Sequence, residues 1–326
     1  MDPISQAFIG SGVAQSFAKN KNNIKRAFFC GAIGGLVPDL DIFIRSTSDS
    51  LLSLEYHRHF THSLFFIPFG GLITAGLLWI IFFYKKKQKF FSVYIFTTLG
   101  FATHGLLDSC TAYGTQILWP FSDYRATWNL VSIVDPLFTI PLIGFTLLSY
   151  YKKDYKLARS GVYLCLIYLL YGFYNKLSAQ EYIEKIAKER GHKIEKIFLS
   201  PSLANNILWR SIYKSGDKYY IDAVNVAPFK EAVFYKGDNV DVIDKEKVFP
   251  NLPTNSRQRQ DIRRFSHFAK DYIYISNLNK NIISDLRYSF VPSGTNSIWG
   301  IIIDENNPQN NAQFVSLRRA NNAKSN

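Results

Sequence analysis

The chain has 326 residues, a formal charge of +13, 16% aromatic residues and three cysteines. This length is ample for a large hydrophobic core, and the aromatic content excludes intrinsic disorder. Cys30, Cys110 and Cys165 are too few and too scattered for a disulfide framework, and the absence of a Cys-x-x-Cys pair excludes a zinc ribbon. The mean hydropathy of −0.04 is typical of a soluble protein, but it averages two unlike parts of the chain.

Residues 1–178 contain long apolar runs with few or no charges. A helix that spans a membrane needs about 20 apolar residues, or about 17 at the short end. Buried helices of a large soluble α protein are the alternative, which repeated runs separated by basic clusters disfavour. We therefore predict an all-α membrane bundle with about five transmembrane helices, from the runs Ala27–Ile44, Ser63–Tyr84, Phe90–Leu107, Leu130–Tyr151 and Ser160–Asn175.

Basic clusters lie in alternate connections between these runs, at Lys19–Arg26, Lys85–Lys89 and Lys152–Arg159. Because basic connections tend to stay in the cytoplasm, this pattern puts all three clusters inside and the connections 45–62 and 108–129 outside. It predicts a multi-pass membrane protein with a cytoplasmic N-terminus. The part after residue 178 is then expected on the non-cytoplasmic side.

The first 18 residues have a helical pattern of their own. Ile4, Phe8, Val13 and Phe17 fall on roughly one helical face, which favours an interfacial or half-inserted helix. Asp2 stands where a signal peptide carries positive charge, so a signal peptide is not expected. We predict an N-terminal interfacial helix before the first span.

The sequence changes character after residue 178, which divides the chain into predicted domains 1–178 and 179–326. Ala179–Arg190 has a helical pattern that Gly191 ends, and Gln258–Asp271 predicts a second helix. Short alternating runs separated by Gly, Pro, Asn and Asp are typical of strands. We predict a soluble α+β domain with a mostly antiparallel sheet, with strands at Lys218–Val226, Tyr272–Ser276, Ile282–Val291, Ile298–Ile303 and Phe314–Leu317.

Several ionisable residues border the apolar runs on the predicted outer side. Membrane segments exclude such groups unless they are paired, metal-bound or functional. Separate connections bring these groups to one side of the membrane, which predicts a shared site. They occur in Pro38–Asp41, in His57–Ser63, in His104–Asp108 and at Asp135.

Histidines combined with carboxylates indicate a metal site. This is the ligand set of a catalytic zinc or of a related first-row metal. His104 and Asp108 are four residues apart, so they share one face of a helix. Pro38 disfavours a regular helix before it, so Asp39 and Asp41 can converge at a local break.

Longer motifs resemble the YdjM-type family. They are MDPISQAFIG, GGLVPDLD, EYHRHFTHSL, GFATHGLLDSCTAYGTQILWPFS and SIVDPLFTIP. That family consists of bacterial inner-membrane proteins described as metal-dependent hydrolases, some of them LexA-regulated. SLANNILWRSIY and SDLRYSF also resemble the long subfamily with an appended C-terminal domain. The resemblance implies an inner-membrane location, with the C-terminal domain periplasmic or extracellular, and dependence on a divalent metal.

The resemblance also implies a set of site residues. Six ligand candidates exceed the four that a tetrahedral zinc uses, so one or two ions are expected, with Zn²⁺ first and Mn²⁺ or Mg²⁺ as alternatives. Asp41 or Asp135 would act as general base, although Asp135 before Pro136 also suits a helix start. Arg58 would hold an anionic phosphate or anchor a lipid headgroup. The implied metal ligands are Asp39, Asp41, His57, His62, His104 and Asp108.

These residues predict a membrane-bound metal-dependent hydrolase. Its metal-activated water would cleave an ester or phosphoester of a lipid or lipid-linked substrate at the outer membrane boundary. The alternatives are a metal-ion or anion transporter, whose site should lie near the bilayer midplane, and a non-catalytic membrane scaffold. Membrane lipids are the expected partners. Nucleic acid is not expected, because the basic segment Arg257–Arg264 should face away from the cytoplasm. The oligomeric state stays open.

Overall fold

The computed structural model describes residues 1–317. The chain folds into two compact units. The helical unit comprises Met1–Ile42, Tyr56–Tyr174 and Leu203–Asn206. The sheet unit comprises the remaining described residues, including the short segment Phe43–Glu55. The predicted order, a helical part followed by a part with antiparallel sheets, is confirmed.

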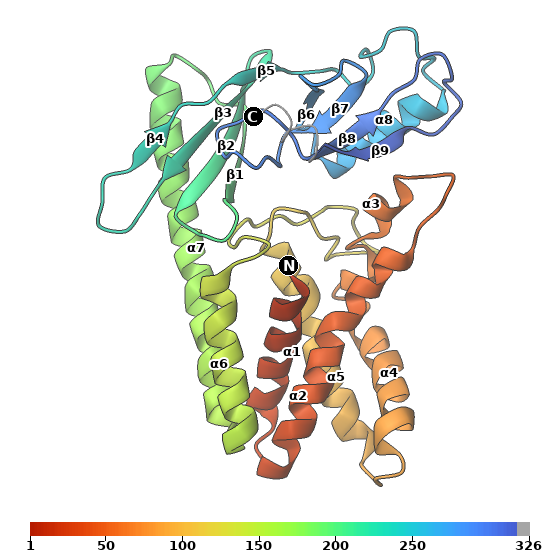
Figure 1. Ribbon diagram of the computed structural model, residues 1–326, viewed down its shortest axis with the longest axis vertical. Coiled ribbons are helices and arrows are strands. Elements are labelled where there is room, and N and C mark those ends of the chain that lie inside the picture. Colours follow the sequence, from red (N-terminus) through yellow and green to blue (C-terminus); the bar gives the residue numbers. More distant parts are fainter. Residues whose placement is uncertain (318–326) are drawn as a thin grey trace. The chain divides into compact units, whose positions relative to one another are not determined.

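Helices make up nearly all the regular structure of the helical unit (Figure 1). Asp2 caps α1, because its side chain accepts a hydrogen bond from the Ser5 amide, and Pro3 follows at a position that needs no N–H. Part of α7 also belongs to the sheet unit. The elements are α1 (Pro3–Phe17), η1 (Lys21–Asn23), α2 (Ile24–Leu36), η2 (Val37–Phe43), η3 (Phe60–His62), α4 (Ile67–Leu78), the π-helical η4 (Trp79–Phe83), α5 (Phe90–Ser109), α6 (Pro136–Lys152) and α7 (Tyr155–Glu189).

Helices α1, α2 and α5 approach one another so closely that side chains larger than hydrogen do not fit between them. A Cβ atom on Gly10 would lie 2.4 Å from the Gly31 carbonyl oxygen, and one on Gly100 would lie 2.2 Å from the same oxygen. Small residues allow this approach in membrane proteins, where close packing rather than the hydrophobic effect holds helices together. Gly31 is therefore the point at which the three helices meet.

The number of candidate membrane spans is smaller than the predicted five. Among residues 1–317, α5 and α7 are long and apolar enough to cross a membrane. A third candidate is the pair Leu52–His62 and Ile67–Phe83, which is bent by 87°. The other apolar runs give shorter helices, because α2 gives way to η2 beside Pro38 and α6 has only 17 residues.

The prediction of an interfacial or half-inserted helix for residues 1–18 is wrong. α1 packs against α2, α5 and α6 (Figure 1). The side chains of Gln6, Ser11 and Gln15 on it are fully buried. Ile4 and Phe17 are instead exposed. The small and polar residues of α1 face its neighbours because they permit close approach, whereas Ile4 and Phe17 point outward.

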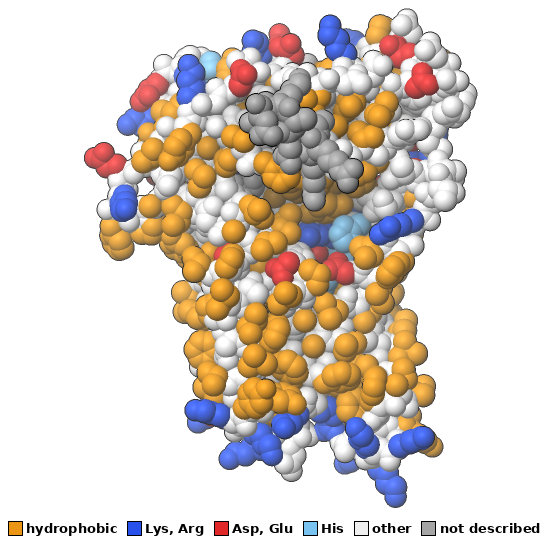
Figure 2. All heavy atoms as spheres, in the orientation of Figure 1, with side chains coloured by type: hydrophobic (Ala, Val, Ile, Leu, Met, Phe, Trp, Pro, Cys, Tyr) orange, Lys and Arg blue, Asp and Glu red, His pale blue; other side chains and the backbone are white. Residues whose placement is uncertain are grey.

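The two ends of the helical unit differ in charge. The three basic connections lie together at one end, where Figure 2 shows Lys and Arg side chains beside a surface of hydrophobic ones. Met1 lies at the other end, since its nitrogen contacts Asp108 near the end of α5. The predicted placement of the N-terminus on the same side as the basic connections is therefore wrong, because α1 runs the length of the bundle between them.

The sheet unit contains two antiparallel sheets (Figure 1). The first has the order β1-β2-β3-β4 with β5 also paired to β3, and the second has the order β6-β7-β8-β9. All five predicted strands are present, with some bounds shortened, whereas β1, β2, β4 and β5 were not predicted. The strands are β1 (Lys196–Pro201), β2 (Leu208–Ser215), β3 (Lys218–Asn225), β4 (Val233–Tyr235), β5 (Asn239–Asp241), β6 (Ile273–Ile275), β7 (Ile282–Asp285), β8 (Trp299–Ile302) and β9 (Gln313–Ser316).

Helices complete the core of the sheet unit. The last turns of α7 place Ala179 and Ile183 against Trp209 and Val224 of the first sheet. The predicted helix over Gln258–Asp271 is confirmed as α8 (Arg257–Phe268), and the short helix α3 (Leu52–Tyr56) begins in this unit.

The arginines of α8 find their partners within the sheet unit. Arg264 pairs with Asp49, Glu55 and Asp261, which ties the segment 43–55 to the helix. Burial alone would raise the pKa of the Asp49 carboxyl, but hydrogen bonds from Arg264 hold it below its ordinary value. Arg259 is almost fully buried and donates to backbone carbonyl groups. The basic segment is thus part of the internal packing rather than a free positive surface.

The glycine packing predicts a sharp difference between two Gly→Ala substitutions. Gly100→Ala should destabilise the protein by about 1–3 kcal/mol, because the new methyl group would overlap a backbone oxygen that cannot rotate away. Gly144→Ala on α6 is the matched control, since no atom lies within 4 Å of its added Cβ. Thermal unfolding in detergent, followed by circular dichroism, measures both. Equal unfolding midpoints for the two variants would contradict the packing described.

Candidate metal centre

Three parts of the helical unit contribute the ionisable residues. After α2, the chain continues as the tighter helix η2, whose three-residue turns carry Asp39 and Asp41. The η3 turn carries His62, and α5 presents His104 and Asp108 one turn apart. Residues far apart in the sequence are thereby placed beside one another.

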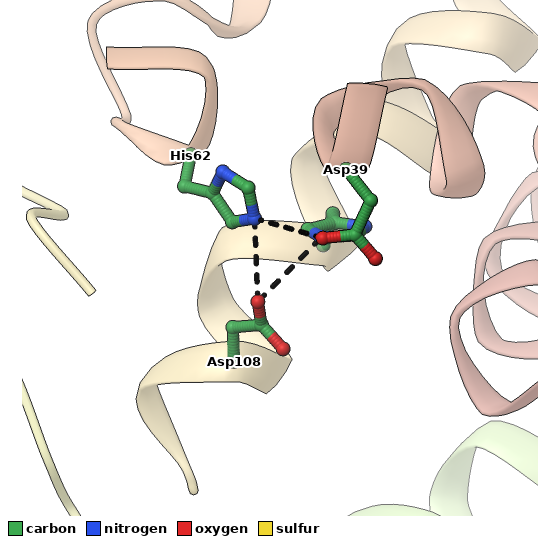
Figure 3. A group of neighbouring side chains, drawn as sticks. Asp39, His62 and Asp108 are labelled. Carbon is green, nitrogen blue, oxygen red and sulfur yellow. Dashed lines mark ion pairs between the residues drawn. The ribbon is translucent and has the colours of Figure 1, made fainter. Parts of the chain in front are cut away.

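Four of these residues direct one atom each toward a common centre. The Asp39 carboxylate oxygen lies 3.5 Å from His62 Nε2 and 3.2 Å from His104 Nε2. Asp108 Oδ2 lies 3.3 Å and 3.5 Å from the same two nitrogens. Figure 3 shows Asp39, His62 and Asp108 pointing toward one another. Ligand atoms about 2.0–2.1 Å from a zinc ion in tetrahedral geometry are separated by about 3.3–3.4 Å, so this spacing suits a metal.

The hydrogen bonds around the centre also fit a metal ion. His62 Nε2 and His104 Nε2 are buried and make no hydrogen bond. A buried polar atom without a partner costs about 1–3 kcal/mol, and a cation bound between the two rings would satisfy both. The other nitrogen of His104 is 2.6 Å from the Gly35 carbonyl oxygen, and that of His62 is 3.2 Å from Asp41. These contacts fix each ring with Nε2 toward the centre, as in histidines that bind metals.

Asp41 and His57 form a pair beside this group. His57 Nδ1 lies 2.8 Å from Asp41 Oδ1. The other Asp41 oxygen accepts hydrogen bonds from the Arg58 amide at 2.9 Å and from the Thr61 hydroxyl at 3.0 Å. Asp39, Asp41 and His57 also have ligand atoms within 4.8 Å of one another, so they make a second group able to hold an ion.

Asp108 has polar partners at both of its carboxylate oxygens. Gln6 Nε2 donates to Oδ1 at 2.9 Å, and the Met1 nitrogen contacts the same oxygen. Arg58 Nε lies 2.9 Å from Oδ2, while its guanidinium also donates to Thr111 and lies over the Tyr113 ring. The Arg58 side chain is buried, so its position suits holding Asp108 rather than capturing a phosphate from solvent.

The candidate Asp135 and two other polar residues, Arg125 and His59, lie outside the two groups. Asp135 is fully buried, caps α6 and accepts hydrogen bonds from the Tyr168 hydroxyl. Arg125 is buried and donates to the carbonyl oxygens of Gly114 and His57. His59 packs its ring against Trp119.

The structure adds residues that the sequence reasoning did not single out. They are Gln6, Thr61 and Gly35, whose carbonyl group orients His104. Gln6 and Thr61 lie within the family motifs quoted above, and an amide side chain in the middle of an apolar helix is itself a signal. The role of a backbone carbonyl leaves no trace in side-chain chemistry.

Comparison with known proteins identifies a family whose match covers the residues of both groups. Residues 1–179 match the YdjM inner membrane protein family. The chain belongs to this family. The match includes every residue of both groups, and the resemblance found in the motifs is confirmed.

Two curated relatives of this YdjM-family chain are named without a biochemical activity. It is 27% identical over 190 residues to the uncharacterized protein YfhP of Bacillus subtilis (strain 168), which covers 58% of this chain and 55% of that protein. It is 31% identical over 114 residues to the inner membrane protein YbcI of Escherichia coli (strain K12), which covers 33% of this chain and 62% of that protein. The chain thus spans little more than half the length of these relatives. No solved structure matches it.

From the convergence of these ligand atoms, we predict that the protein binds a divalent ion and that binding requires both histidines. His62→Ala and His104→Ala should each lower the metal content of the purified protein at least tenfold, because each removes one ligand. His267→Ala is the control, since that histidine is exposed on α8. Elemental analysis by mass spectrometry measures the metal per chain. Unchanged metal in the two site variants would refute the assignment.

A second prediction concerns how α5 positions His62. A Cβ atom on Gly105 would lie 2.0 Å from the His62 carbonyl oxygen, so Gly105→Ala should push η3 away from α5. Metal affinity should fall by about 10–100-fold, as when groups that orient metal ligands are lost. Gly76→Ala, with no atom within 4 Å of the added Cβ, should leave it unchanged. Competition with a fluorescent chelator measures the affinities, and equal values would contradict the geometry.

Proposed function

We propose that the chain is a metal-dependent hydrolase of an ester or phosphoester in a membrane lipid or lipid-linked molecule. The observation that supports this most is the centre of Asp39, His62, His104 and Asp108, where two buried ring nitrogens lack hydrogen bonds. Two histidines and two carboxylates suit Zn²⁺ first and Mn²⁺ second. An ion there would polarise a carbonyl or phosphoryl oxygen and lower the pKa of water.

The His57–Asp41 pair supplies the acid and base of the proposed reaction. Asp41 orients the ring through Nδ1, and the His57 side chain is 23% exposed, so its Nε2 is able to take a proton from the attacking water. The same proton would then pass to the leaving oxygen. This assignment replaces the expectation that Asp41 or Asp135 is itself the base, because Asp41 already accepts four hydrogen-bonding contacts and Asp135 is a buried helix cap.

The surroundings of Asp39 support an amphiphilic substrate. Asp39 is the exposed member of the four-residue group, with 24% of its side chain accessible, whereas the other three are buried. Leu40 and Ile42 beside it in η2 are exposed hydrophobic residues, as is Leu106 on α5. A substrate that reaches Asp39 therefore meets apolar surface, which a lipid chain would cover.

The charge pattern supports an orientation for the site. The three basic connections lie at the opposite end of the helical unit from Met1 and Asp108. If those connections are cytoplasmic, as basic connections tend to be, the centre faces the outer boundary of the inner membrane. Met1 then lies on that outer side as well. Membrane lipids are the partners of this arrangement, and the sheet unit is periplasmic or extracellular.

The role of His57 separates chemistry from metal binding. His57→Gln should keep the metal content while the turnover number falls about 10²–10⁴-fold, since a positioned acid–base group contributes that much. The full chain, loaded with Zn²⁺ or Mn²⁺ in turn, is offered mixed phospholipids in detergent micelles, and released products are measured by mass spectrometry. Asp135→Asn serves as the matched carboxylate control.

Three results would count against the hydrolase. A fully metal-loaded wild type without turnover on esters or phosphoesters would overturn it. Equal turnover in His57→Gln would overturn the acid–base assignment. Accumulation of the metal inside proteoliposomes would favour the transporter instead.

A further inference from the structure

The basic end of the helical unit contains a cavity of about 430 Å³ that lies far along α5 from the metal centre. It is formed by the start of α2, by the π-helical η4 and by the connection that follows it. Lys25, Arg26 and Lys86 supply three positive charges to its wall. Neither an aspartate nor a glutamate is among its lining residues.

In the part of the chain that the structure describes, none of these three cations forms an ion pair with a carboxylate. Arg26 donates from its two terminal nitrogens to the neutral side chains of Gln88 and Asn23, and its buried Nε has no hydrogen-bond partner. Neutral amides position the guanidinium without cancelling its charge.

The local backbone adds to the positive potential. Lys25 and Arg26 lie in the first turn of α2, where the helix dipole is positive and basic side chains are unfavourable. Asn23, the residue before this turn, makes no capping hydrogen bond with its side chain. Placing two cations there costs stability unless an anion binds nearby.

Three phenylalanines also line the cavity, next to an exposed apolar surface. Phe82 and Phe83 pack edge-on against Phe29, with ring centroids 5.4 Å and 6.3 Å apart. Phe29 and Phe82 are both partly exposed. Beyond them the surface of η4 and α4 is a row of exposed apolar side chains, at Ile81, Ile80, Leu77 and Ile73.

We propose that this cavity binds the phosphate of an anionic phospholipid, with an acyl chain along η4 and α4. Arg26 and Lys86 pair with the phosphate oxygens, and Phe29 and Phe82 cover the first carbons of the chain. Basic pockets between helices at the cytoplasmic side of membrane proteins are suited to such headgroups. The site is separate from the metal centre, so it does not depend on the proposed hydrolysis.

The test uses the full chain in detergent with short-chain phosphatidylglycerol, phosphatidylcholine or inorganic phosphate, and native mass spectrometry counts the bound molecules. We expect phosphatidylglycerol to be retained at least fivefold more than phosphatidylcholine. Retention should fall at least fivefold in Arg26→Gln/Lys86→Gln and also decline in Lys86→Gln alone, which leaves the Arg26 hydrogen bonds intact. Lys152→Gln/Lys156→Gln removes two exposed charges outside the cavity and should retain the lipid.

Three results would overturn the proposal. Equal losses in the cavity variants and in the Lys152/Lys156 control would mean general attraction to a basic surface. Equal retention of both lipids by the wild type would remove the selectivity for an anion. Displacement of phosphatidylglycerol by millimolar inorganic phosphate, with phosphate itself retained, would assign the cavity to a free anion.

Discussion

The helical unit is organised around buried polar atoms that need a cation. His62 Nε2 and His104 Nε2 lie together without hydrogen bonds, and each such atom costs about 1–3 kcal/mol when buried alone. A divalent ion would satisfy both at once. The partners on the far side of each ligand, Asp41 and the Gly35 carbonyl among them, hold the imidazoles in the one orientation that an ion requires.

Close helix packing makes that arrangement rigid. Gly31, where α1, α2 and α5 meet, lies one turn before Gly35, whose carbonyl orients His104. Gly105 lets η3 approach α5 closely enough for His62 to reach the same centre. The glycines therefore serve two purposes, because they allow the backbones to touch and they set the distances between ligands from different elements. Sites built on such rigid elements hold a precise geometry.

The sequence predicted the chemistry of this site better than its architecture. Histidines and carboxylates at the ends of apolar runs are recognisable because membrane segments exclude such groups unless they are paired, metal-bound or functional. The predictions of five spans and of an interfacial helix at residues 1–18 were not confirmed, since apolarity alone does not distinguish a span from a short packed helix. α1 illustrates the difficulty, because its buried face carries Gln6, Ser11 and Gln15 while Ile4 and Phe17 are exposed. Similarly, the pairing of Asp41 with His57 depends on a turn whose shape residue spacing does not give.

X-ray absorption at the metal edge tests the central claim most directly. For the purified wild-type chain, the account predicts one tightly bound divalent ion surrounded by nitrogen and oxygen atoms only. The scattering from the outer ring atoms should correspond to two imidazoles, contributed by His62 and His104. Cysteine sulfur should be absent from the spectrum, since all three cysteines are buried elsewhere as free thiols. A folded, metal-free protein that binds no divalent ion, or a spectrum with sulfur or without imidazole scattering, would contradict the account.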